Sequence, residues 1–177
     1  MEDAKWNHAP IKKEVAIRGR FAMLACDIEY CLLNIIMFCN PDPYNHERFG
    51  QFKDMKMKTK IDCAIKDIKK YKPQYYEEFK EDFDGLELFR VVRNDMVHNI
   101  GSFPNEPDLS VFHLMSVEKD ENGIEAIKSK EYTEHHITHC LAKFARINGN
   151  LSALWFRLKR EHDEGIQPFA HPSTRSE

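Results

Sequence analysis

The sequence predicts an all-α fold, a bundle of about four long helices with a short β-hairpin or loop insertion between the third and the fourth. Apolar residues recur at spacings of three and four along most of the chain, which is the period of an amphipathic helix. Prolines and glycines separate these periodic stretches. The chain has 177 residues, 42% of them hydrophobic, which suits one compact domain with a buried core. We expect this domain over residues 11–164, between a flexible N-terminus (1–10) and a mobile C-terminal tail (165–177).

The first helix is predicted over Ile11–Cys39, and Pro41 and Pro43 end it. One apolar stripe forms its core face: Ile17, Phe21, Leu24, Ala25, Ile28, Leu32, Ile35, Ile36 and Cys39. A second apolar stripe predicts that the helix packs on more than one side: Met23, Cys26, Tyr30, Leu33 and Met37.

Part of this helix, Phe21–Cys39, is about as long as a membrane span. Asp27, Glu29 and Asn34 interrupt its centre, which favours a buried helix of a soluble protein. The start of the chain lacks the basic and then apolar segments of a secretory signal. The five cysteines form no Cys-x-x-Cys pair and suit reduced thiols. These features predict a cytoplasmic protein that does not bind a membrane.

The second helix is predicted over Glu47–Tyr71 and the third over Gln74–Ile100, with Pro73 between them. Gly101 and Pro104 follow the third helix as a stop signal. The core face of the third helix is predicted to carry Phe79, Phe83, Leu86, Phe89, Met96 and Ile100.

The segment before the last helix has a different character. Leu109–Val117 is rich in β-branched and apolar residues, which favours a strand. The turn dipeptide Asn122-Gly123 precedes Ile124–Ile127, so the segment predicts a short hairpin. The helical period returns over Tyr132–His162, which predicts the last helix.

Arg93 interrupts the core stripe of the third helix, between Phe89 and Met96. A guanidinium stays charged at any relevant pH, so in such a place it needs a carboxylate partner or faces a phosphate site. Asp27 and Glu29 of the first helix are the candidate carboxylates. Asp27 is preferred because it belongs to a polar stripe of that helix.

His98 follows Arg93 by five residues, which is about 140° around a regular helix. Arg90, Asn94 and His98 lie at spacings of four, share a face and could line one wall of a cleft. Imidazole titrates near neutrality and can move a proton, while an arginine binds phosphate oxygens. The pattern therefore indicates phosphate chemistry, with Arg90 in a supporting place.

The run from Glu87 to Ile100 resembles the Arg-x4–6-His signature of the HEPN family, through Arg93-Asn94-Asp95-Met96-Val97-His98. The resemblance implies an all-helical bundle, often dimeric, in which the signature helices of two subunits form one RNA-cleaving site. It implies a metal-independent endoribonuclease, of the kind found in toxin–antitoxin and phage-defence systems, that leaves a cyclic phosphate end. Its partners would be RNA, a second copy of the chain, and an antitoxin or other regulatory protein.

The resemblance also implies a role for each catalytic candidate. Arg93 would hold the scissile phosphate, and Asn94 would orient or contact the substrate. His98 would act as general acid or base on the ribose 2′-hydroxyl and the 5′-oxygen. Two alternatives stay open. The chain could be a non-catalytic HEPN-like module that dimerises or binds a partner, or Arg93 could form a structural ion pair with Asp27 or Glu29 while His98 merely caps the end of the helix.

Residues 53–72 hold eight lysines and three aspartates, although the whole chain has a net charge of −3. This local excess could steer the RNA backbone. The candidate RNA-binding residues are Lys56, Lys60, Lys66, Lys69 and Lys70. The alternative is a solvated helix face with pairs such as Asp62 with Lys66.

His135 and His139 have the helical spacing of two metal ligands, but no third ligand accompanies them. The sequence also lacks the glycine-rich loops that hold nucleotide phosphates. We therefore expect no metal and no cofactor.

Overall fold

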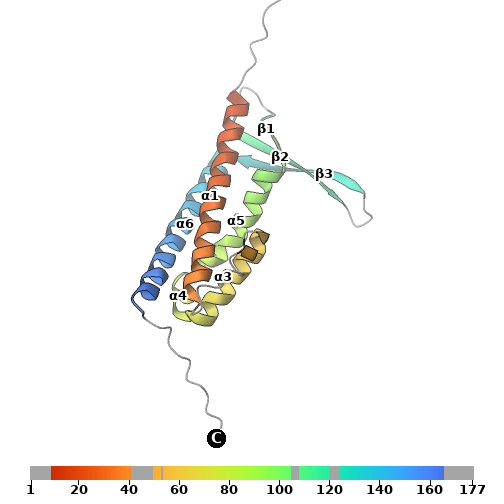
Figure 1. The fold of residues 1–177 in the computed structure, drawn as a ribbon. Helices are drawn as coiled ribbons and strands as arrows, with labels where there is room; N and C mark the ends of the chain where they lie inside the picture. Colours follow the sequence, from red (N-terminus) through yellow and green to blue (C-terminus); the bar gives the residue numbers. More distant parts are fainter. Residues whose placement is uncertain (1–8, 41–49, 53, 105–107, 120–123, 166–177) are drawn as a thin grey trace, which may run out of the picture. The chain divides into compact units, whose positions relative to one another are not determined.

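The computed structural model describes residues 9–40, 50–52, 54–104, 108–119 and 124–165 (Figure 1). The structure is mostly helical and carries one small antiparallel sheet of three strands. The elements, in chain order, are α1 (Ala9–Cys39), α3 (Met57–Tyr71), α4 (Pro73–Glu78), α5 (Lys80–His98), β1 (Ile100–Ser102), β2 (Val111–Lys119), β3 (Glu125–Thr133) and α6 (Glu134–Asp163). The expected helical class is thus correct for most of the chain, and the sheet adds a β component to it.

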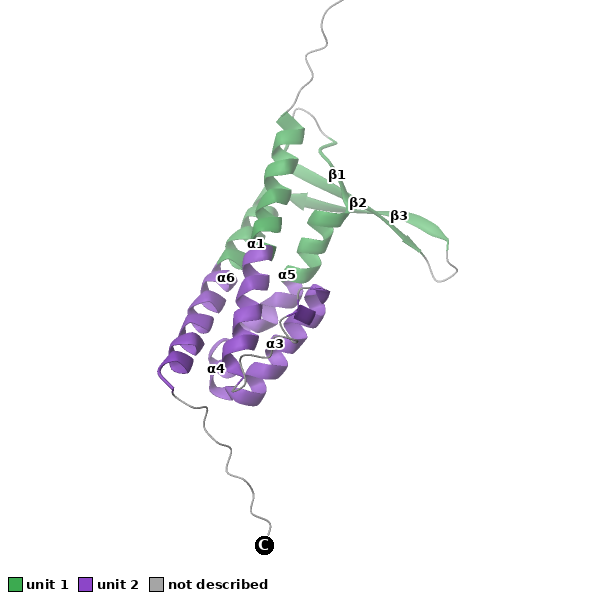
Figure 2. Cartoon of the chain, in the orientation of Figure 1, with its two compact units in different colours: residues 1–25, 89–145 green, residues 26–88, 146–177 purple. Residues whose placement is uncertain are grey.

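The chain divides into two compact units (Figure 2). Unit 1 comprises residues 1–25 and 89–145, and unit 2 comprises residues 26–88 and 146–177. The helices α1, α5 and α6 each contribute a segment to both units. The single domain predicted over residues 11–164 stays a prediction. Nearly all residues of the two predicted terminal segments, 1–10 and 165–177, lie outside the described residues.

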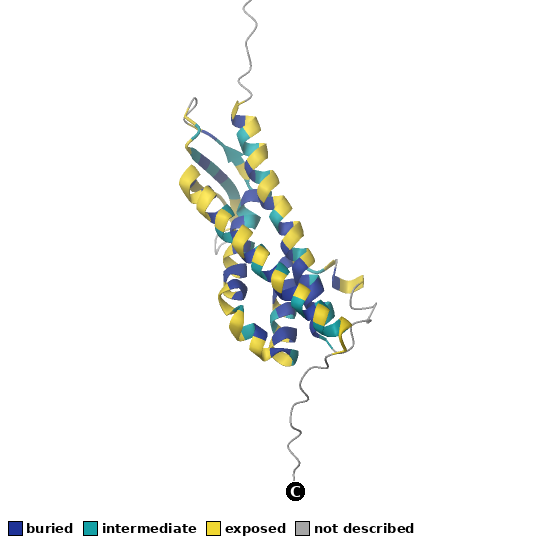
Figure 3. Cartoon of the chain, turned by 90° about the vertical axis from the view of Figure 1, so that its left-hand side faces the viewer, coloured by how far each residue is buried: buried dark blue, intermediate teal, exposed yellow. Residues whose placement is uncertain are grey.

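Unit 2 has a core of aliphatic and aromatic side chains from the inner faces of its helices (Figure 3). A helix with one apolar stripe gains stability by burying that stripe, and this accounts for the alternation of buried and exposed residues. At Gly85 of α5, a Cβ atom would lie 2.6 Å from Cδ1 of Ile147 of α6. The close approach of these two helix segments therefore requires a glycine at this position.

Unit 1 is built around three phenylalanines. The ring of Phe144 lies edge-on to those of Phe21 and Phe89, at centroid distances of 6.3 and 5.1 Å. All three side chains are fully buried. This cluster joins α1, α6 and the end of α5, and so it fixes the helix segment that carries the signature.

The sheet of unit 1 has the strand order β1-β2-β3. β2 and β3 pair antiparallel from Val111↔Thr133 to Lys119↔Glu125, which confirms the predicted hairpin. β2 begins and ends two residues later than the predicted strand Leu109–Val117, and β3 continues beyond the predicted end at Ile127. The predicted turn at Asn122-Gly123 lies outside the described residues. β1 pairs with the other edge of β2, from Ile100↔Met115 to Ser102↔His113. The sequence analysis missed β1 because three residues are too few for an alternating pattern.

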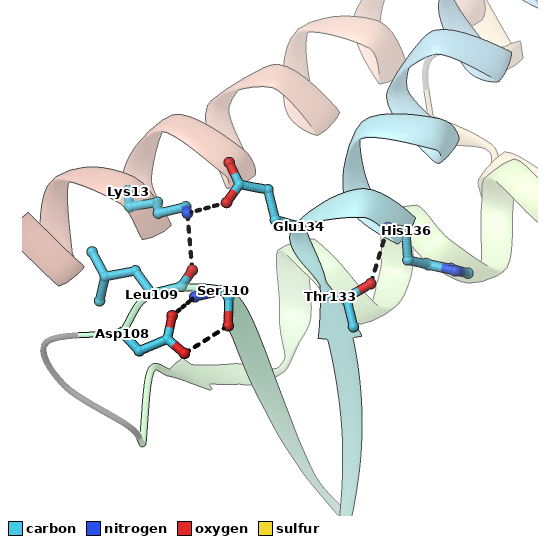
Figure 4. A network of polar contacts seen from close by, with 7 residues as sticks. All are labelled: Lys13, Asp108, Leu109, Ser110, Thr133, Glu134 and His136. Atoms are coloured by element: carbon cyan, nitrogen blue, oxygen red, sulfur yellow. Dashed lines mark hydrogen bonds and ion pairs between the residues drawn. The ribbon is translucent and has the colours of Figure 1, made fainter.

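The start of α6 is fixed by polar contacts (Figure 4). The Thr133 hydroxyl accepts a hydrogen bond from the backbone N–H of His136 at 3.1 Å, as an N-cap does. The ammonium of Lys13 donates to the carbonyl of Leu109 and to the carboxylate of Glu134, both at 2.9 Å. These contacts explain why the helix begins at Glu134 and not at the predicted Tyr132.

The predicted second helix, Glu47–Tyr71, is wrong as a continuous element. Lys56 adopts an extended conformation, with φ −64° and ψ 150°, so α3 begins only at Met57. This break lets both Phe52 and Met57 turn inward, at 5% and 8% exposure. Residues 47–49, the predicted start, lie outside the described residues.

The predicted third helix is also divided. It breaks at Phe79 into α4 and α5, and α5 ends at His98 rather than at Ile100. The guanidinium of Arg18 donates to the carbonyl oxygens of Met96 and Asn99 and so satisfies the end of the helix. Ile100 lies in β1 at 68% exposure, so its placement in the core was wrong.

The predicted second apolar stripe of α1 packs only in part: Leu33 and Met37 are half-buried, and the ring of Tyr30 lies edge-on to that of Trp155. Met23 and Tyr30 are 69% and 57% exposed, and Cys26 is exposed as well. The buried residues of α1 follow the first stripe for the most part, with Cys31 and Asn34 buried beside it. α1 has the length and the composition of a membrane-spanning helix, and this also fits the core helix of a soluble protein. The cytoplasmic location stays a prediction.

Candidate functional site

The signature residues lie on the last two turns of α5, in unit 1. Met96 is fully buried and anchors this segment in the core. Arg93 and Asn94 are half-buried, and His98 is exposed. The helix thus holds the polar residues at the boundary between core and solvent, where a substrate can reach them.

The structure brings the three catalytic candidates together. Nη1 of Arg93 lies 3.1 Å from Nε2 of His98 and 3.2 Å from Oδ1 of Asn94. The side chains of Arg93 and His98 start from different sides of the helix. The long side chain of Arg93 reaches across to the imidazole. A guanidinium can only donate, so Nε2 of His98 must accept with its lone pair. The contact therefore requires a neutral imidazole whose proton is on Nδ1.

The guanidinium of Arg93 is incompletely bonded. Its Nε is the one buried side-chain nitrogen or oxygen, among the described residues, that has no hydrogen-bond partner. A buried donor without a partner costs about 1–3 kcal/mol, and such groups often occur at functional sites. This Nε is closed to solvent, so binding of an oxyanion through it requires the side chain of Arg93 to move.

Asp95 connects the signature to the hairpin, a link that the sequence analysis missed. Its carboxylate accepts hydrogen bonds from Tyr132 Oη at 2.8 Å and Lys130 Nζ at 2.7 Å, and from Asn99 Nδ2 at 3.4 Å. Asp95 stands between Asn94 and His98 in the sequence, which is a signal that it belongs to the site region. Its partners depend on the long-range register of β3, which no local pattern encodes.

The environment of Tyr132 changes its acidity. Burial of the phenol, together with the hydrogen bond to the Asp95 carboxylate and its charge, raises the pKa of Tyr132. The folded state therefore favours the neutral phenol, the form that can donate to Asp95.

Tyr132→Phe is expected to lower the free energy of unfolding by about 1–2 kcal/mol at pH 7, because Asp95 loses a donor. The wild type should lose this contribution as the pH rises above about 10, where the tyrosine of the unfolded state begins to ionise. Urea unfolding at pH 7 and at pH 10.5 measures both effects. An equal loss of stability in the wild type and in Tyr132→Phe between these pH values would contradict the role of the phenol.

The predicted supporting residues have different positions. Arg90 is half-buried on α5, one turn before Asn94. Asp27 is exposed and Glu29 is half-buried on the part of α1 that belongs to unit 2. The carboxylate of Glu29 pairs with Lys60 at 2.5 Å. Support of Arg93 by Asp27 or Glu29 stays a prediction.

The candidate RNA-binding lysines all lie on α3 or immediately before it. Lys60 is only 5% exposed and bonds Glu29, so its charge is engaged within the protein. Lys56 and Lys66 are exposed, and so are Lys69 and Lys70. The ammonium of Lys69 lies 4.2 Å from the ring centre of Tyr76. Four of the five lysines therefore present their charge at the surface of unit 2.

The two histidines with metal-ligand spacing, His135 and His139, are both exposed on α6. Over the part of the chain that the structure describes, no group of three or more His, Cys, Asp or Glu side chains could hold a metal ion.

No family model, no curated protein and no solved structure matches this chain. The candidate site is therefore defined by its own geometry and by the local resemblance of the signature.

Proposed function

We propose that this protein is a metal-independent endoribonuclease of HEPN type that acts as a homodimer with a composite active site. The observation that supports this most is the convergence of Arg93, Asn94 and His98, with Nη1 of the arginine 3.1 Å from the imidazole. The partnerless Nε of Arg93 adds an unused donor to the same group. A donor fork beside a neutral imidazole suits the cleavage of a phosphodiester by proton transfer.

The reaction follows from the chemistry of these groups. The substrate phosphate replaces the imidazole as the partner of Arg93, which frees Nε2 of neutral His98 to accept the proton of the ribose 2′-hydroxyl, and the 2′-oxygen attacks the adjacent phosphorus. The bond from phosphorus to the 5′-oxygen breaks, and the leaving oxygen takes up a proton. Arg93 stabilises the charge that develops on the phosphoryl oxygens. The products are a 2′,3′-cyclic phosphate and a 5′-hydroxyl.

The geometry of the reaction favours two copies of the chain. The attacking 2′-oxygen and the leaving 5′-oxygen lie on opposite sides of phosphorus, so one histidine acts as base and a second one is best placed to protonate the 5′-oxygen, whereas each signature has a single histidine. A second copy would supply the second histidine from its own α5. The exposed position of His98 is compatible with such an approach.

The experiment is incubation of the purified protein with single-stranded RNA in excess EDTA. We expect internal cleavage, with cyclic phosphate ends detected by mass spectrometry. Intact RNA would exclude the proposal, and so would cleavage that requires a divalent metal ion. In cells, a toxin or phage-defence role predicts growth arrest on expression that His98→Ala relieves.

A second candidate is a non-catalytic module that dimerises or binds a partner. It is favoured by the bonding of Asp95, which ties the signature segment to β3 through Tyr132 and Lys130 as a structural element would. This candidate predicts that RNA stays intact and that substitutions in the signature change assembly alone.

A further inference from the structure

The outer face of the sheet in unit 1 carries a cluster of apolar side chains. Ile100 pairs with Met115 and Val117 pairs with Ile127, and directly paired residues point to the same face. Met115 and Val117 are two residues apart in β2, so all four share one face. Ile100, Val117 and Ile127 are 68%, 62% and 74% exposed. Four apolar side chains thus form a nearly continuous surface that no described residue covers fully.

The opposite face of the hairpin shows that this arrangement is unusual. Near the helices it buries Phe112, Leu114 and Tyr132, as an inner face does. Further along, it carries the ion pair of Lys128 with Glu118, at 2.5 Å. Antiparallel sheets normally place apolar residues inward and polar residues outward. In the half of this hairpin that lies farther from the helices, the apolar residues point outward and the charged residues inward. Apolar clusters that stay uncovered at a protein surface mark interaction surfaces.

The apolar cluster, defined by Ile100, Met115, Val117 and Ile127, has a basic and an acidic side chain at each end. At one end, His113 and Glu131 lie 3.4 Å apart on the same face. At the other end, Lys119 pairs with Glu125 in the strand register. Each end therefore offers one basic and one acidic group.

A surface with this charge pattern is complementary to itself. In a two-fold arrangement each contact is made twice. With the axis running along the strands between the two packed faces, each end of the face lies over the same end of its copy. Lys119 would then meet Glu125 of the partner subunit, and His113 would meet the partner's Glu131. The four apolar residues of the two copies would cover each other between these pairs, as in packed sheets.

We propose that this sheet face is the homodimer interface and that its occupant is a second copy of the chain. The inference deepens the homodimer of the proposed function by naming the surface that forms it, and it does not depend on RNA cleavage. Ile100 follows His98 by two residues, so the interface adjoins the signature. This proximity would bring the two histidines of a dimer toward one interface.

Sedimentation velocity of the full chain over a range of concentrations tests the proposal. We expect the wild type to be a dimer, and Ile127→Lys to raise the dissociation constant by about a hundredfold or more because it places a charge at the centre of the contact. Ala126→Lys is the matched control, since Ala126 is the exposed neighbour of Ile127 on the opposite face. It should leave the dimer intact, and circular dichroism should show both variants folded.

A charge exchange tests the two-fold arrangement itself. Lys119→Glu alone and Glu125→Lys alone should each weaken the homodimer about tenfold, because symmetry introduces two like-charge contacts. A mixture of the two variants should form a heterodimer with the wild-type dissociation constant, because each like-charged pair then faces a pair of opposite charge. Weak association of the mixture is the result expected if Lys119 and Glu125 interact only within one copy, and it would contradict the two-fold arrangement.

A monomeric wild type would overturn the inference, and so would a dimer that Ile127→Lys does not weaken. The result is independent of the activity assay. Cleavage of RNA by a wild type whose dimer withstands Ile127→Lys would reject the sheet interface and retain the endoribonuclease. If Ile127→Lys disrupts the dimer and the wild type does not cleave RNA, the sheet interface would be retained and the endoribonuclease rejected.

Discussion

Replacing His98 with alanine is expected to reduce the rate of RNA cleavage by about a thousandfold, since general acid–base catalysis contributes on the order of 10²–10⁴. His98 is exposed, so the free energy of unfolding should change by less than about 0.5 kcal/mol. Single-turnover cleavage in EDTA measures the first effect, and urea unfolding measures the second. The combination of lost activity and kept stability would identify His98 as a chemical participant.

The matched control for this variant is His135→Ala, which removes an exposed imidazole from α6 in the same unit. It should cleave RNA at the wild-type rate. Arg93→Lys offers a further comparison, because lysine keeps the charge but loses the planar fork of donors. Equal cleavage by the wild type and His98→Ala would reject the role assigned to the imidazole.

Phe89→Ala should have the largest effect on stability, about 3–5 kcal/mol. Phe89 is fully buried and packs edge-on against Phe144 at 5.1 Å, so its removal leaves a cavity at the centre of unit 1. Thermal and urea unfolding measure the loss. Phe156→Ala is the control, since Phe156 is 59% exposed on α6 and should cost far less. Similar losses in the two variants would contradict the assignment of the core.

Phe89→Ala also separates packing from chemistry. Arg93 follows Phe89 by one helical turn, so loosening of this segment should displace the guanidinium as well. Activity should recover in part at low temperature or in stabilising osmolytes. His98→Ala should show no such recovery, because it removes the reacting group itself.

Long helices were the most predictable part of the fold. The apolar stripe of α1 and the final helix followed from spacing alone, because one buried face determines where the apolar residues must stand. The second stripe on α1 was correct only in part, since exposed apolar residues such as Met23 look the same in a sequence as buried ones. The break at Lys56 depends on burying Phe52 and Met57 together, which only the tertiary structure decides.

The residues of the candidate site could be predicted from the sequence, but their contacts with other helices and strands could not. Arg93, Asn94 and His98 are close in sequence on one helix, so their meeting required only local geometry. The contacts of Asp95 with β3 join residues more than thirty positions apart and depend on strand register. The pairing of Lys60 with Glu29 joins α3 to α1 for the same kind of reason, and it engages one of the five candidate RNA-binding lysines within the protein.

The most direct test of the central claim compares two RNAs of identical sequence in EDTA, one unmodified and one 2′-O-methylated throughout. The proposed reaction needs a free 2′-hydroxyl as its nucleophile, so we predict cleavage of the unmodified RNA into fragments with cyclic phosphate ends and no cleavage of the methylated RNA. Cleavage of both RNAs, or of neither, would contradict the account.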